Sequence, residues 1–337
     1  MGNLAKHSIK DTDYLFASAR IKSMEKNLLS REKLERMSEA KSLEEAFKIL
    51  NENGWPEVLA PTLPATEEML AARRSEAFAL VRNMAPDKRL PDVFLIKYDY
   101  HNIKTILKGE ATGQDPLPLL IEAGRIPGRS LLVMLREENY ADLTKTMVSA
   151  IAEAKDVLAR TQDPQLLDFV LDKAMYRDML DMAGEFGSDY LTGYVRLMID
   201  SVNLRTAVRL RRMGKGIELL RHALIPGGNI GSSRLLNEIT PDLIETIFGA
   251  SSLAPAAVAG AAALRGEGSL AALDLACDDV LLRYLKGAKY VAFGAEPLIG
   301  YLAAVEAELT AVRTVVAGRL ADLSAEMIIE RLRETYV

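Results

Sequence analysis

The stretch D-Y-H-N-I-K-T at residues 99–105 recurs as D-S-V-N-L-R-T at 200–206 and, more loosely, as E-L-T-A-V-R-T at 308–314. The shifts between successive copies are 101 and 108 residues, and Ala311 stands in the third copy where the first two have asparagine. Self-similarity at one period indicates a structural unit that is used several times. The stretch therefore predicts a chain built from three copies of one module.

A second pattern, at the starts of expected helices, keeps the same period. It consists of a polar residue, a leucine and a large apolar residue four positions after the leucine. It begins at Ser42, Asp142 and Asp242, which are 100 residues apart. Serine and aspartate accept hydrogen bonds from the first free N–H groups of a helix. We therefore predict that each of these three residues caps the helix that follows it.

A third match concerns the turns between helices. Ile-Pro-Gly at 126–128 recurs as Ile-Pro-Gly at 225–227, which is 99 residues later. Proline lacks a backbone donor and glycine tolerates positive φ, so each tripeptide is expected to end a helix and turn the chain. Three kinds of match that keep one period near 100 residues are hard to attribute to chance.

The whole chain has the apolar spacing of helices. Apolar residues recur at intervals of three and four, as between Leu34 and Leu50, and no segment shows sustained alternation bounded by hairpin turns. The predicted fold is all-α, with helical modules at 1–112, 113–212 and 213–337. Three large copies are compatible both with closure around a pseudo-threefold axis and with an open solenoid.

Composition excludes several classes of protein. The net charge of the 337 residues is −5, whereas a nucleic-acid binder is usually basic. One cysteine, Cys277, and three scattered histidines cannot build a disulfide framework or a zinc site. The longest apolar run, at 253–264, is too short to cross a bilayer as a helix. Residues 1–6 lack the apolar core of a signal peptide, so export is not expected.

The polar part of the repeated stretch allows two interpretations. Asp99 and Asn102 lie three apart on a predicted helix, as do Asp200 and Asn203. Such a pair can satisfy backbone groups between neighbouring helices of each module, or it can bind a partner. We favour the structural role, since Ala311 shows that the polar set is not needed in every module.

Two other segments are candidates for function. Asp278 and Asp279, preceded by Asp274, approach the magnesium-binding D-D-x-x-D pattern of prenyl-diphosphate enzymes, but the third acid is missing. These acids are expected on the solvated face of a helix, and an enzyme that uses them is the less favoured hypothesis. The glycine-rich loop at 227–231 lacks the preceding strand and the G-K-[ST] ending of a phosphate loop.

A basic stripe follows the second copy of the repeated stretch. Its residues are Arg205, Arg209, Arg211, Arg212, Lys215 and Arg221, against the single acid Glu218. The stripe is interpreted as a solvated helix end, with contact to an acidic partner surface as the alternative.

Several fragments, taken in order, carry a resemblance to a known family. They are D-Y-L-F-A-S-A-R-I at 13–21, R-E-K-L-E-R-M at 31–37, K-S-L-E-E-A at 41–46, K-Y-D-Y-H-N-I-K at 97–104, the repeat at 200–206, I-P-G-G at 225–228, and the closing segments at 306–309 and 331–333. In their order and spacing the chain resembles, essentially end to end, the C subunit of the V/A-type ATPases and ATP synthases. The d subunit is its counterpart in eukaryotic V-ATPases.

This resemblance implies an all-helical funnel of three similar modules with no catalytic site, cofactor or metal. The implied function is that of a noncatalytic central-stalk component of the rotor, which transmits torque during ATP-driven ion transport or ATP synthesis. Its implied partners are the proteolipid ring of c/K/L-type subunits and the shaft of the D and F subunits, at the cytoplasmic face of the membrane. A helical-repeat adaptor without a rotary role is the alternative.

Overall fold

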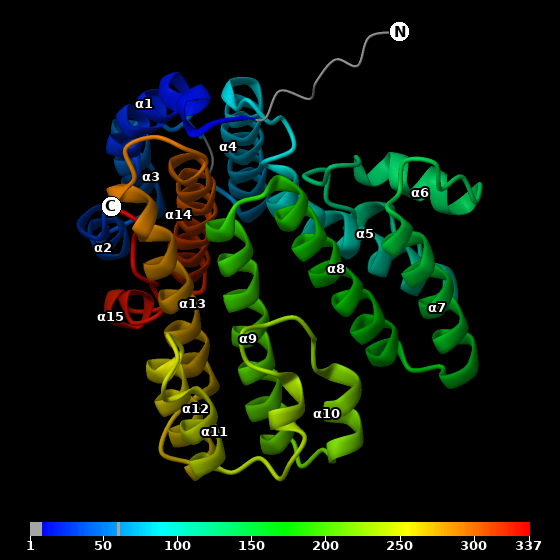
Figure 1. Cartoon of the computed structure of the whole chain (residues 1–337). Helices are drawn as coiled ribbons and strands as arrows, with labels where there is room; N and C mark the ends of the chain where they lie inside the picture. Colours follow the sequence, from blue (N-terminus) through cyan, green and yellow to red (C-terminus); the bar gives the residue numbers. More distant parts are fainter. Residues whose placement is uncertain (1–8, 59–60) are drawn as a thin grey trace, which may run out of the picture. The chain divides into compact units, whose positions relative to one another are not determined.

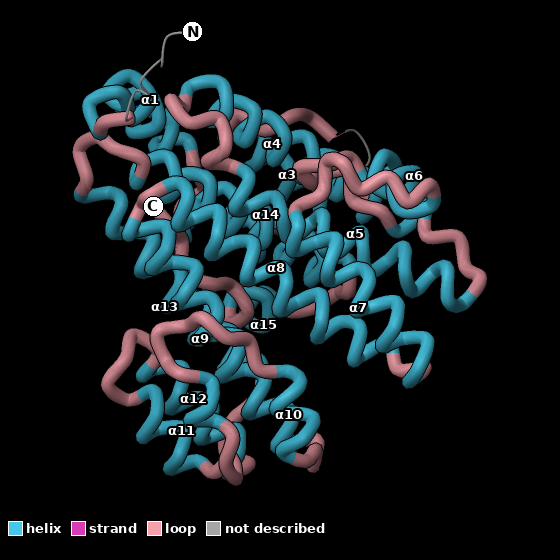
Figure 2. The backbone as a smooth tube through the Cα atoms, turned by 45° about the vertical axis from the view of Figure 1, so that its right-hand side comes forward, coloured by secondary structure: helices cyan, strands magenta, loops and turns pink. Residues whose placement is uncertain are grey.

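The computed structural model describes residues 9–58 and 61–337 (Figure 1). Over these residues the backbone forms α-helices, short 3-10 helices and loops, with no strand (Figure 2). The all-α prediction is confirmed. The N-terminal residues 1–6, on which the expectation about export depended, lie outside the described residues. None of the helices within residues 9–58 and 61–337 combines the length and the apolar composition of a membrane-spanning segment.

The chain divides into two compact units. Unit 1 consists of Met1–Pro91 and Leu282–Val337, and unit 2 consists of Asp92–Leu281. Unit 1 contains one copy of the repeated stretch, at 308–314, and unit 2 contains the other two. The three modules at 1–112, 113–212 and 213–337 stay a prediction.

Unit 1 combines an N-terminal and a C-terminal part of the chain. Its helices are α1 (Leu15–Met24), α2 (Arg31–Glu39), α3 (Leu43–Glu52), α4 (Leu63–Met84), α14 (Glu296–Leu320) and α15 (Ala325–Ile329), with the 3-10 helices η1 (Asp11–Tyr14), η2 (Glu25–Asn27) and η5 (Gly287–Tyr290). The long helix α14 packs on α4, α1 and α2 (Figure 1). Residues 297–305 of this helix are buried at every position, in agreement with their continuous apolar sequence.

Unit 2 contains two helical groups joined through α8 and α9. Its elements are α5 (Asp92–Thr112), η3 (Leu117–Leu119), α6 (Gly128–Arg136), α7 (Lys145–Thr161), α8 (Pro164–Phe186), α9 (Asp189–Arg212), α10 (Ile217–Ala223), η4 (Ser232–Leu235), α11 (Pro241–Phe248), α12 (Ala254–Arg265) and most of α13 (Leu270–Lys286). Helix α8 packs on α5, α7 and α9, while α12 packs on α9 and α11. The repeated stretches therefore lie on α5 and α9, each beside a long partner helix.

The predicted helix caps are right in one case and wrong in two. Ser42 accepts a hydrogen bond from the backbone N–H of Glu45 at 3.2 Å and caps α3, as predicted. The caps of α7 and α11 are Thr144 and Thr240, not Asp142 and Asp242. Helix α7 begins at Lys145, too late for Asp142, and Pro241 occupies the first position of α11, which leaves Asp242 inside the helix.

Candidate functional site

The repeated stretch on α5 fastens that helix to the loop that leads into α6. Both Asp99 and Asn102 are completely buried. The Asn102 side-chain amide donates to the carbonyl of Ile121 at 2.7 Å, and its oxygen accepts from the N–H of the same residue at 2.8 Å. Asp99 Oδ1 accepts from the N–H of Ile126 at 3.1 Å. We call this arrangement the α5 clamp.

The same residues on α9 form a second clamp. Asn203 donates to the carbonyl of Ile225 at 2.7 Å and accepts from its N–H at 2.8 Å. Asp200 accepts hydrogen bonds from the backbone and side-chain nitrogens of Asn229 and from the N–H of Ile230, each at 3.0 Å. In this α9 clamp, as in the α5 clamp, the polar pair satisfies the backbone of a loop. The structural interpretation of the repeated stretch is confirmed for both copies.

The hydrogen bonds also correct the alignment of the two loops. The asparagines bind Ile121 in the α5 clamp and Ile225 in the α9 clamp, and the aspartates accept from the N–H groups of Ile126 and Ile230. The equivalent loop residues are therefore 104 apart. The match of Ile-Pro-Gly at 126–128 with 225–227 is therefore wrong. The repeat in these loops is Ile-x-x-Gly-x-Ile, at 121–126 and 225–230. The identical Ile-Pro-Gly tripeptides make the wrong alignment look stronger than the correct one, because the correct alignment shares only two isoleucines and one glycine.

The shared glycine of the two loops has a steric reason. A Cβ built on Gly124 would overlap Asp99 Oδ1, and one built on Gly228 would overlap Asp200 Oδ1. The backbone of each loop can approach its carboxylate only because this position has no side chain.

The third copy of the stretch forms a reduced clamp on α14. Glu308 Oε1 accepts a hydrogen bond from the backbone N–H of Leu29 at 2.8 Å, and its Oε2 lies 3.7 Å from Arg73 Nη2. Ala311 stands at the asparagine position. This α14 clamp joins the C-terminal part of the chain to the segment between η2 and α2, within unit 1.

The basic residue of the repeated stretch makes an ion pair in every copy. Lys104 pairs with Asp172 of α8 at 2.6 Å, Arg205 pairs with Asp278 of α13, and the Nε of Arg313 lies 2.6 Å from Glu67 Oε1 of α4. A second pair follows one turn later in two copies: Lys108 with Asp168 at 2.6 Å, and Arg209 with Asp274 at 2.7 Å. Each repeated helix is thus tied both to a loop and to a long neighbouring helix.

These pairs connect the two charged segments singled out in the sequence. The side chains of Asp274 and Asp278 are 25% and 31% exposed, and on this partly solvated face of α13 they are bound by Arg209 and Arg205. Within residues 9–58 and 61–337, no group of three or more histidine, cysteine, aspartate or glutamate side chains is arranged to hold a metal ion. Arg211 pairs with Glu238 at 3.1 Å, so the basic stripe is also partly neutralised.

The glycine-rich loop at 227–231 binds a side chain of the same chain. The N–H groups of Asn229 and Ile230, which would face a phosphate, donate instead to Asp200. The loop is therefore a backbone partner of the α9 clamp.

The three clamp carboxyl groups share one electrostatic property. Burial raises the pKa of Asp99 to about 7, although the Ile126 N–H and the Arg125 charge partly oppose the shift. Burial likewise raises the pKa of Asp200, against the hydrogen bonds from Ile230 and Asn229, and it raises the pKa of Glu308. These groups resist ionisation because they are removed from water.

Comparison with known proteins gives one consistent result. The sequence model of a family described as ATP synthase (C/AC39) subunit matches residues 17–331. The C subunit of the V-type sodium ATPase of Enterococcus hirae is 22% identical over 317 residues, which cover 94% of this chain and 97% of that protein. The C subunit of the A-type ATP synthase of Methanocaldococcus jannaschii is 23% identical over 350 residues, which cover 96% and 87%. The corresponding protein of Haloferax volcanii is 27% identical over 258 residues, covering 72% and 74%.

Proposed function

We propose, on the premise that this chain belongs to the ATP synthase (C/AC39) subunit family, that it couples the central shaft of a rotary complex to the membrane ring. Its relatives are named as C subunits of V-type and A-type complexes, so the chain is a structural component and not a catalyst. In the proposal its two partners are the shaft of the D and F subunits and the ring of proteolipid subunits. It works at the cytoplasmic face of the membrane.

The observation that carries the proposal is the repeated double attachment of α5, α9 and α14. Each of these helices is held to a loop by a buried carboxylate and to a long neighbouring helix by an ion pair. A part that transmits torque must resist twisting, and closely packed helices have low compressibility. Attachments at two points on each helix oppose the sliding of one helix past another.

We further propose that the three modules close around a pseudo-threefold axis to form a funnel. The α14 clamp supports this arrangement, because it joins the last copy of the repeated stretch to a segment near the start of the chain. An open solenoid would leave its terminal modules without such a contact. An experimental density map of the isolated chain tests closure: three similar lobes around a hollow are expected, and three unlike lobes would contradict it.

Reconstitution with cognate subunits tests the coupling role. The chain is expected to bind a D/F shaft with defined stoichiometry and to retain that shaft on a proteolipid ring in a pull-down through the ring. The control omits the chain, and the shaft should then be lost from the ring. If the chain binds neither partner and associates only with soluble proteins, the adaptor alternative is correct and the rotary proposal fails.

A further inference from the structure

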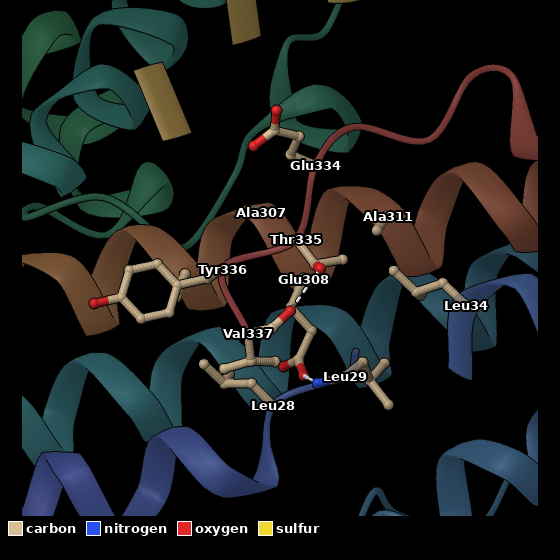
Figure 3. Close-up of a pocket in the computed structure, with 11 residues that line it drawn as sticks. Leu28, Leu29, Leu34, Ala307, Glu308, Ala311, Glu334, Thr335, Tyr336 and Val337 are labelled. Carbon is tan, nitrogen blue, oxygen red and sulfur yellow. Dashed lines mark hydrogen bonds between the residues drawn. The ribbon is translucent and has the colours of Figure 1, made fainter. Parts of the chain in front are cut away.

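The asparagine position of the third copy faces a small cavity. Ala311 and Glu308 on α14, Leu29 and Leu34, and the C-terminal residues Thr335 and Val337 all contribute to its wall (Figure 3). The cavity has a volume of about 10 Å³. A space of this size accommodates one water molecule if polar partners line it.

One wall of this cavity is a carboxylate that is only partly satisfied. The side chain of Glu308 is 3% exposed, and its Oε1 is bound to the N–H of Leu29. Its Oε2 has no hydrogen-bond partner among the described residues, and Arg73 Nη2 is too distant at 3.7 Å. A buried carboxyl oxygen without a hydrogen-bond partner is costly, so a partner at this point would be strongly favoured.

The contrast with the other two clamps explains how the space arises. In the α5 and α9 clamps an asparagine side chain fills the corresponding position and binds the loop backbone. In the third copy the backbone partner of Glu308 is Leu29, which follows the 3-10 helix η2. Ala311 has no amide to fill the corresponding position, and Glu308, one methylene longer than aspartate, lies beside the space that the shorter side chain leaves.

The C-terminal residues form one side of the cavity. Arg31 donates to the carbonyls of Leu332 and Arg333 at 3.0 and 3.3 Å, and the Tyr336 hydroxyl donates to Glu25 Oε1 at 3.2 Å. The Thr335 hydroxyl donates to the carbonyl of Val337 at 2.7 Å (Figure 3). The bonds of Arg31 and Tyr336 attach the segment to α2 and η2, and Thr335 and Val337 contribute to the cavity wall.

We propose that this cavity is a hydration site, in which one water molecule forms a hydrogen bond with Glu308 Oε2 and stands in the place of the missing asparagine. The oxygens of Thr335 and Val337 supply further partners. The site belongs to the reduced clamp of unit 1 and does not depend on the rotary function.

Two substitutions at position 311 distinguish a hydrated site from a packing defect. Ala311→Val fills the space with methyl groups and displaces the water, so the unfolding equilibrium constant should rise roughly tenfold in urea titrations. Ala311→Ser places a hydroxyl donor there and should change the constant by less than about threefold. If the cavity were only a packing defect, valine would fill it and stabilise the protein, which would overturn the proposal.

Controls separate hydration from helix propensity and crowding. Ala317→Val and Ala317→Ser, at an exposed position of the same helix, measure the propensity cost of each substitution. In a Glu308→Leu background, which removes the unsatisfied oxygen, Ala311→Val should no longer destabilise relative to its parent. An equal loss in both backgrounds would show that crowding is the cause, and the proposal would fail.

A crystal structure of the unmodified protein at high resolution provides an independent measurement. Density for one water is expected at about 2.7–3.0 Å from Glu308 Oε2. Well-ordered density for Glu308 and the C-terminal residues with no water peak between them would refute the site.

Discussion

The α5 and α9 clamps contain the same two residue types at the same spacing, but their carboxylates are satisfied to different degrees. Asp200 receives three hydrogen bonds distributed over both oxygens. Asp99 receives one, from Ile126, and its Oδ2 has no hydrogen-bond partner among the described residues. The difference comes from one loop position, where Asn229 in the α9 clamp corresponds to Arg125 in the α5 clamp.

That position shows how a repeated motif can diverge without losing its geometry. The Asn229 side chain reaches Asp200 directly, whereas Arg125 Nε stays 3.7 Å from Asp99 Oδ2. The helix residues therefore determine where the loop attaches, while the loop residue determines how well the buried charge is compensated. Substitutions can test the asparagine contacts, which the two clamps share, separately from the hydrogen bonds of the carboxyl groups, which differ.

The largest effect is expected at the glycine that allows each loop to approach its carboxylate. Gly228→Ala should lower the free energy of unfolding by about 3 kcal/mol, because the added Cβ displaces the Asp200 carboxylate from three hydrogen bonds. Gly124→Ala should cost less, since Asp99 accepts only one. Urea denaturation of both variants provides the measurement.

Gly184→Ala is the matched control for the glycine variants. Gly184 lies on α8, and a Cβ there would meet nothing within 4 Å. This substitution should be neutral or slightly stabilising, as is usual in a helix. A Gly228→Ala protein as stable as the Gly184→Ala protein would contradict the steric account of the loops.

The asparagines test the part that the two clamps share. Asn102→Ala and Asn203→Ala each leave one loop residue, the half-buried Ile121 or the buried Ile225, without the asparagine partners of its N–H and carbonyl. Each should lower the free energy of unfolding by about 2 kcal/mol, and by similar amounts. Asn237→Ala, at an exposed site in unit 2, should change it by less than about 0.5 kcal/mol. A large inequality between the first two variants would mean that the clamps are not equivalent.

Replacing each clamp aspartate by asparagine tests the difference between the clamps, which is the number of hydrogen bonds that the carboxyl group accepts. Both oxygens of Asp200 accept from N–H donors, so in Asp200→Asn the NH₂ group must face at least one of these donors. We expect the free energy of unfolding to fall by about 2 kcal/mol. Asp99→Asn can keep its oxygen on the Ile126 N–H and place the NH₂ where no donor lies, so its loss should be below about 1 kcal/mol at pH 7. Chemical denaturation of the pair gives the comparison, and the reverse order would refute it.

A separate prediction concerns the pH dependence of the stability, which Asp99 should cause because its pKa is raised in the folded state. The folded protein keeps this proton up to about pH 7, whereas the unfolded chain loses it near the ordinary pKa of 3.8. The native state therefore binds more protons between these values, and the contribution of Asp99 to the free energy of unfolding falls as the pH rises through this window. The slope is at most about 1.4 kcal/mol for each pH unit, and the contribution is constant above the window.

The difference in stability between the unmodified protein and Asp99→Asn isolates this contribution. Measured from pH 4 to pH 8, the difference should move in favour of the asparagine variant up to about pH 7 and then level off. A difference that is independent of pH would show that Asp99 is not protonated in the folded state at neutral pH.

Part of this architecture could be predicted from local sequence alone. The spacing of apolar residues is enough for the all-α fold, and the recurrence of the 99–105 stretch is enough for the equivalence of α5, α9 and α14. Ser42 could be recognised as a cap because it directly precedes its helix. Asp142 and Asp242 could not be judged in the same way, since a shift of two residues in the helix start moves the cap to another side chain.

The partners of the charged residues could be identified only from the three-dimensional structure. Arg205 and Asp278 are 73 residues apart and carry no shared local pattern, so the acidic segment and the basic stripe looked like separate surface features. The antiparallel approach of α9 and α13 makes them partners. Similarly, Gly124 and Gly228 became interpretable only when the carboxylate behind each of them was known.

The sequence by itself determined the helical class, the repeated helix stretch and the family, because these depend on residue spacing and order along the chain. Only the tertiary structure decided which loop each buried carboxylate binds, which charges neutralise one another, and that the third copy binds a segment near the beginning of the chain. The physical reason is that hydrogen bonds and ion pairs depend on distances in space between side chains, and residues far apart in the sequence acquire those distances only when the helices pack.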